Sequence, residues 1–158
     1  MLESSEAGSI LFHQIISFPA GVPFPPLPEQ KGGADKQAAR RRRVLVVDDE
    51  RLIADTVTDI LNEHGFNAVG VYSGMEAMEA ARRFDPEIIL SDVLMPRMSG
   101  IELAIRIREE FPETPVVLFS GQAATAELIN EARAEGYEFE LLPKPIHPRE
   151  LIARLKEL

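Results

Sequence analysis

From residue 44 onward, short runs of wholly apolar residues alternate with longer stretches whose apolar residues recur at helical spacing. The run 44–47 has no polar side, which is typical of a parallel strand buried on both faces. The stretch 50–64 instead places Ile53, Val57 and Ile60 on one face, as an amphipathic helix does. The predicted strands are 44–47, 67–71, 87–92, 116–120 and 138–142, and the predicted helices are 50–64, 73–83, 101–110, 123–135 and 148–158. Five strand–helix units without hairpin signals predict a doubly wound α/β fold, with five helices covering one five-stranded parallel sheet.

The first 43 residues have a different composition. Prolines crowd residues 19–28, and two glycines and a polar stretch follow them. Each proline removes a backbone donor and fixes one torsion, which disfavours both helices and central strands. We therefore predict a disordered, proline-rich tail over residues 1–43, which ends in a basic run at 40–43, and one domain over residues 44–158.

Charge is distributed unevenly between these two parts. Residues 1–43 carry six Lys or Arg against four Asp or Glu, whereas residues 44–158 carry eleven against twenty-two. So acidic a domain would be repelled by nucleic acid phosphates, and four arginines beside a domain usually form a solvated flank. We expect no nucleic acid partner, and a steep salt dependence of binding would mark the alternative, an arginine arm that contacts nucleic acid.

The chain has no cysteine, so disulfides and thiolate metal sites are excluded. Its apolar runs are far shorter than the ~20 residues of a membrane-spanning helix, and its first ten residues contain no Lys or Arg of the kind that begins a secretory signal. We expect a cytoplasmic protein without a membrane partner.

Reactive side chains follow four of the five predicted strands. Asp48 and Asp49 follow the first strand, Asp92 ends the third, Ser120 ends the fourth, and Lys144 comes shortly after the fifth. Ligands of open α/β sheets collect at the carboxyl ends of the strands, so these groups should converge. Clustered carboxylates favour a hard cation such as Mg²⁺. A carboxylate beside this ion can act as a nucleophile toward phosphorus, with a nearby ammonium and hydroxyl to neutralise the charge.

A simpler interpretation has to be weighed for each of these acids. Acidic residues at strand ends are often only solvated, and Asp49 precedes a predicted helix that it could cap. Their occurrence at successive strand ends favours a common site over separate structural roles.

Four segments carry a resemblance to a known family. They are VLVVDDE at 44–50, SDVLMPRMSG at 91–100, Ser120-Gly121, and LPKP at 142–145. In this order they resemble the receiver domain of two-component response regulators, and the similarity extends over residues 44–158. The resemblance implies a flavodoxin-like sheet with strand order 2-1-3-4-5.

The resemblance also implies roles for the metal site. Asp92 would be the phosphoacceptor and a ligand of Mg²⁺. Asp49 would bind the ion directly, Asp48 mostly through water, and the backbone carbonyl of Leu94 would be a further ligand.

Lys144 and Ser120 would contact the phosphoryl oxygens, and the peptide bond before Pro145 would be cis, as is usual in the family. The chain departs from the family pattern at position 141, where receivers usually carry Tyr or Phe and this chain has leucine. The connection 136–144 also looks one residue longer than usual. We therefore do not expect the response to phosphorylation that depends on an aromatic ring at this position in other receivers.

The resemblance implies a phosphorylation-driven switch or relay that receives its phosphoryl group from a sensor histidine kinase or a histidine phosphotransfer protein. Such a protein catalyses only its own phosphorylation and dephosphorylation. Because no residues follow the last predicted helix, we expect a single-domain regulator. Two alternatives remain: a protein-binding module that works without phosphorylation, and a Mg²⁺-dependent phosphatase of Rossmann-like fold, for which no insertion is long enough to form a cap.

Overall fold

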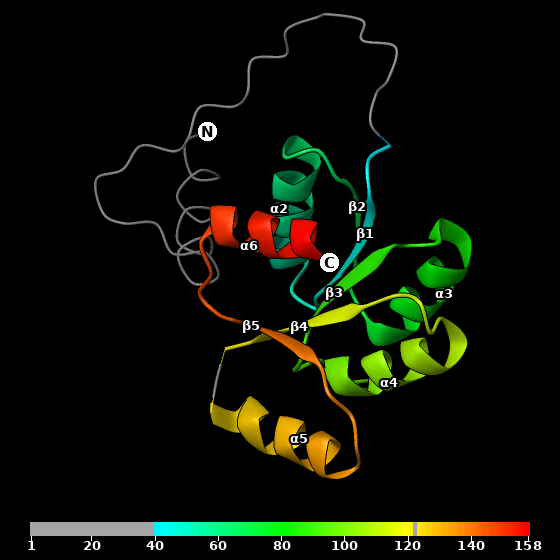
Figure 1. The fold of residues 1–158 in the computed structure, drawn as a ribbon, viewed down its shortest axis with the longest axis vertical. Helices are drawn as coiled ribbons and strands as arrows, with labels where there is room; N and C mark the ends of the chain where they lie inside the picture. Colours follow the sequence, from blue (N-terminus) through cyan, green and yellow to red (C-terminus); the bar gives the residue numbers. More distant parts are fainter. Residues whose placement is uncertain (1–39, 122) are drawn as a thin grey trace, which may run out of the picture.

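The computed structural model describes residues 40–121 and 123–158, and most of the predicted tail lies outside these residues. In chain order the elements are β1 (Arg43–Val47), α2 (Arg51–Glu63), β2 (Asn67–Val71), α3 (Gly74–Phe84), β3 (Ile88–Asp92), α4 (Gly100–Glu110), β4 (Val116–Ser120), α5 (Ala123–Ala134), β5 (Glu140–Pro143) and α6 (Pro148–Glu157). The five strands pair in parallel in the order β2-β1-β3-β4-β5 (Figure 1). The predicted α/β fold, its strand order and its five helices in this part of the chain are confirmed.

The helices cover both faces of the sheet because the buried strands are apolar on both sides. On β1, Val44 and Val46 pack in one cluster with α2 and α6, while Leu45 and Val47 pack in another with α3 and α4. Figure 1 shows α2 and α6 on one side of the sheet and α3 and α4 on the other. Full burial of one such aliphatic side chain stabilises the fold by roughly 1.5–3 kcal/mol. None of the helices in the described ranges combines the length and apolarity needed to cross a membrane.

Local signals fix where two of the helices begin. The Ser73 hydroxyl accepts from the backbone N–H of Glu76 at 3.1 Å and so caps α3, whose predicted range began at this serine. The start of α4 is a full capping box, in which Ser99 and Glu102 each accept from the other's backbone N–H. This second cap was not recognised in the sequence, although its Ser-x-x-Glu spacing is the usual signal.

The last strand differs from the prediction at both ends. It runs over Glu140–Pro143, two residues later than the start expected at Glu138. The preceding chain closes α5 instead: Gly136 adopts a left-handed φ of 91°, and the N–H of Tyr137 donates back to the carbonyl of Ala132 at 2.9 Å. Pairing with β4 begins only at Glu140, which lies opposite Val117.

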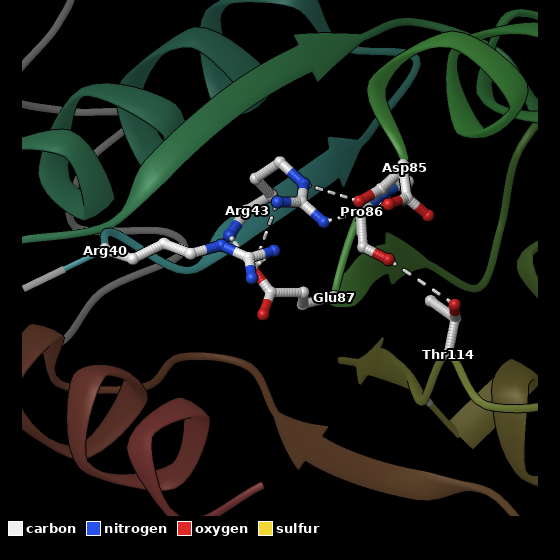
Figure 2. Close-up of polar contacts among 6 residues, drawn as sticks. All are labelled: Arg40, Arg43, Asp85, Pro86, Glu87 and Thr114. Carbon is white, nitrogen blue, oxygen red and sulfur yellow. Dashed lines mark hydrogen bonds and ion pairs between the residues drawn. The ribbon is translucent and has the colours of Figure 1, made fainter.

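The basic run at 40–43 contacts the folded domain near the amino-terminal ends of β1 and β3 (Figure 2). The Arg43 guanidinium lies 3.0 Å from the Asp85 carboxylate, and the Arg43 backbone N–H donates to Glu87 at 3.0 Å. Arg42 donates to the backbone oxygen of Leu155 near the end of α6 at 3.0 Å. The expectation of a solvated flank is therefore wrong for Arg42 and Arg43, which bind groups of the domain itself.

Candidate functional site

The sheet brings the reactive side chains to one edge. In the parallel register, Asp92 of β3 lies opposite Phe119 of β4, and Ser120 lies opposite Pro143 of β5. The following residues, Lys144 among them, therefore leave the sheet at the same edge as Asp92. Asp48, Asp49 and Asp92 each present a carboxylate oxygen, and these oxygens lie within 4.8 Å of one another.

Lys144 supplies a positive charge to this cluster. Its ammonium nitrogen lies 3.0 Å from Oδ1 of Asp92 and 3.6 Å from Oδ2 of Asp48, and its side chain is 16% exposed. The backbone N–H of Lys144 donates to the carbonyl of Ser120 at 2.9 Å, which ties this residue to the end of β4. The Lys144–Pro145 peptide bond is cis, as the resemblance implied.

Burial dominates the electrostatics of the cluster. It raises the pKa of Asp48 from 3.8 to about 6, opposed by Lys144, while the neighbouring carboxylates raise this pKa further. Burial also raises the pKa of Asp92 above its ordinary value, and Lys144 again opposes the shift. The positive charge of Lys144 thus offsets only part of the cost of burying these negatively charged carboxylates. A divalent cation bound among them would offset more of this cost.

The two acids after β1 have different environments. Asp48 is 3% exposed, and its Oδ1 accepts from the backbone N–H of Glu50 at 3.0 Å. Asp49 is exposed, and the capping position of α2 belongs to Glu50, whose side chain makes no capping bond. The alternative interpretation of Asp49 as a helix cap is therefore wrong, and its carboxylate remains directed to the acidic cluster.

The chain after Asp92 is folded tightly against α4. The backbone N–H of Gly100 donates to the carbonyl of Val93 at 2.9 Å, and a Cβ added to Gly100 would lie 2.0 Å from the backbone oxygen of Asp92. Only glycine permits this close approach. Leu94, whose carbonyl is a predicted ligand, lies in the turn between them with an exposed side chain. Sequence reasoning did not assign a role to Gly100, although this glycine ends the segment 91–100 that carries part of the resemblance.

Ser120 has a partner that the sequence did not indicate. Its hydroxyl oxygen lies 2.8 Å from that of Thr125, which is 2% exposed on the first turn of α5. Leu141 is half-buried and pairs in register with Leu118. The nearby rings of Tyr137 and Phe139 stack on each other with centroids 6.3 Å apart.

The donor set fits magnesium. The clustered ligands are all carboxylate oxygens, which Mg²⁺ prefers, and the cluster contains no histidine of the kind that transition metals favour. Beside Asp49 a groove of about 550 Å³ opens, and Arg51 and Arg97 line it together with Tyr72. Asp49 is the member of the acidic cluster that lines this groove, and Glu76 adds a second carboxylate to the lining that carries the two arginines.

Comparisons with known proteins match one family of domains. The family model described as response regulator receiver domain matches residues 44–156. The probable transcriptional regulatory protein TcrX of Mycobacterium tuberculosis is 36% identical over 115 residues, which cover 73% of this chain and 48% of that protein. The DNA-binding response regulator MtrA of the same organism is 31% identical over 118 residues, covering 73% and 50%. The chain thus spans about half the length of the curated relatives it matches.

Solved structures show the same fold. The chemotaxis protein CheY4 of Vibrio cholerae superposes with a TM-score of 0.65 at 29% identity, over 74% of this chain and 98% of that one. The similarity therefore extends through nearly all of that solved chain.

Proposed function

Because this chain belongs to the response regulator receiver domain family, we propose that Asp92 accepts a phosphoryl group and thereby switches or relays a two-component signal. The observation that carries the proposal is the contact of 3.0 Å between Lys144 and Asp92 inside the carboxylate cluster. The donor would be a sensor histidine kinase or a histidine phosphotransfer protein.

In the proposed transfer, a carboxylate oxygen of Asp92 forms a bond to phosphorus while the bond from phosphorus to the donor imidazole breaks. The electron pair of that bond leaves with the imidazole nitrogen. Lys144 lowers the pKa of Asp92 against the effect of burial and so favours the nucleophilic carboxylate. Its ammonium also lies where the phosphoryl oxygens would arrive, and Ser120 can donate a hydrogen bond from the neighbouring strand.

Mg²⁺ is the proposed cofactor. Asp48, Asp49 and Asp92 would hold it together with the carbonyl of Leu94, and when bound it would neutralise charge on the phosphoryl group. Hydrolysis of the acyl phosphate by water would return the Asp92 carboxylate and release inorganic phosphate. We propose no catalytic action on other substrates.

Acetyl phosphate provides a direct test. Incubation of the protein with acetyl phosphate and Mg²⁺ should add one phosphoryl group to the intact mass of the wild type and none to Asp92→Asn. Asp59→Asn, at an exposed acid on α2, is the matched control and should be modified like the wild type. Equal modification of Asp92→Asn, or no modification of the wild type, would contradict the proposal and favour a phosphorylation-independent binding module.

We also propose that residues 40–158 make no nucleic acid contact of their own. Arg42 and Arg43 are already engaged with the domain, and the domain is strongly acidic. The relative MtrA is named as a DNA-binding protein, but the region that matches this chain covers only 50% of it. Mixed-sequence DNA should show no salt-dependent binding, and a steep salt slope would refute this part of the proposal.

A further inference from the structure

The hydroxyl pair of Ser120 and Thr125 connects the functional site directly to α5. The backbone of Ser120 is fixed, since its carbonyl accepts from Lys144 N–H at 2.9 Å. Its side chain is held separately, by the 2.8 Å contact with the buried Thr125 hydroxyl. Of these two constraints, only the side-chain contact can change by rotation about a single bond.

A serine hydroxyl has one proton to donate, and phosphoryl oxygens can only accept. Ser120 must therefore aim that proton at the phosphoryl group if it is to bind there after Asp92 is modified. We propose that Thr125 is a positioning residue: before phosphorylation it accepts the hydrogen bond that the Ser120 hydroxyl donates, and so holds this hydroxyl on the α5 side. The phosphoryl group on Asp92 then accepts this hydrogen bond in place of Thr125, which draws the Ser120 hydroxyl away and loosens the first turn of α5. This inference rests on the proposed function of Asp92.

The contact between Ser120 and Thr125 leads to a helix, α5, that packs against the residue at position 141. The helix contributes Ile129 and Ala132 to a small apolar cluster, and Leu141 packs against the same cluster from β5. The ring that the family resemblance implies at position 141 is absent, and the rings of Tyr137 and Phe139 stack on each other instead. A change at Ser120 therefore reaches α5 through a hydroxyl contact, without the rotation of an aromatic side chain at position 141.

The test measures the binding of beryllofluoride, a phosphoryl mimic, in the presence of Mg²⁺. Thr125→Val keeps the shape of the side chain and removes its hydroxyl. If Thr125 favours the unmodified arrangement, the variant should bind beryllofluoride about fivefold more tightly, the factor that one ordinary hydrogen bond produces. Amides of 125–134 should exchange faster in the unmodified variant than in the wild type. Thr125→Ser restores a hydroxyl and should return both readouts to wild-type values.

A double-mutant cycle separates this role from simple packing. In a Ser120→Ala background there is no hydroxyl for Thr125 to hold, so Thr125→Val should change the affinity no further. An equal gain with and without Ser120 would overturn the proposal, as would an unchanged affinity in Thr125→Val. If the valine variant does not fold, Thr125→Ala is used in the same cycle and judged by the same outcomes.

The proposed function is checked in parallel by the intact mass of the wild type after acetyl phosphate treatment. A wild type that neither gains a phosphoryl group nor binds beryllofluoride would overturn the proposed function and this inference together. A wild type that does both, with Thr125→Val indistinguishable from it, would overturn this inference alone.

Discussion

Replacing the buried Asp48 by asparagine should stabilise the metal-free protein at neutral and alkaline pH. Burial raises the pKa of Asp48 from 3.8 to about 6. Each unit corresponds to 1.36 kcal/mol of preference for the protonated form, so the ionised carboxylate lowers the free energy of unfolding by about 3 kcal/mol. Asparagine removes this charge and keeps an Oδ1 that can accept from Glu50 N–H. Lys144 keeps its contact of 3.0 Å with Asp92.

The sign of the pH dependence follows from the raised pKa. The folded state binds the Asp48 proton more tightly than the unfolded state does, so the contribution of Asp48 to the free energy of unfolding falls as pH rises from about 4 through 6. Asp48→Asn lacks this titration. Its advantage should approach about 3 kcal/mol at pH 8 and drop below about 1 kcal/mol at pH 4.

Urea unfolding of both proteins with a metal chelator at pH 8 and pH 4 measures this difference. Asp49→Asn is the matched control, because its carboxylate is exposed and should give a much smaller gain at pH 8. An Asp48→Asn variant that is no more stable than the wild type at pH 8, or equally stabilised at both pH values, would refute the reasoning.

Three further predictions concern neighbouring positions. Gly100→Ala should destabilise the protein by about 3 kcal/mol or more in urea unfolding and slow phosphorylation, because its Cβ would meet the Asp92 carbonyl oxygen at 2.0 Å; full stability would contradict the close approach. Thr58→Val should raise the free energy of unfolding by about 1 kcal/mol, since the buried Thr58 hydroxyl has no hydrogen-bond partner among the described residues; a loss of stability would show that it has one. Asp49→Ala should greatly weaken Mg²⁺ binding in an NMR titration while leaving the fold intact, and unchanged affinity would remove Asp49 from the site.

The fold was predictable because its signals are local and repeated. A strand buried on both faces must be apolar throughout, and the run at 44–47 meets this condition. The strand ends then bring Asp48, Asp92 and Lys144 together without any further information, because parallel strands share one carboxyl edge. The strand order came with the family resemblance, since alternation alone does not distinguish one order from another.

The features that the sequence did not reveal depend on contacts between distant segments. Arg42 meets the end of α6, more than a hundred residues away, and nothing beside it in the chain indicates that contact. Thr125 looks like an ordinary helix residue until the fold places it beside Ser120. The delayed start of β5 follows the closure of α5 at Gly136 and Tyr137, which lie between the predicted helix 123–135 and the predicted strand 138–142.

The central claim is that Asp92 itself carries the phosphoryl group. Borohydride reduces an acyl phosphate and leaves free carboxylates unchanged, so reduction after acetyl phosphate treatment followed by peptide mass mapping identifies the modified residue. The proposed function predicts that Asp92 alone is converted to homoserine, in a Mg²⁺-dependent manner. Conversion of Asp48 or Asp49 in its place, or of no residue in a protein whose intact mass has increased, would contradict it.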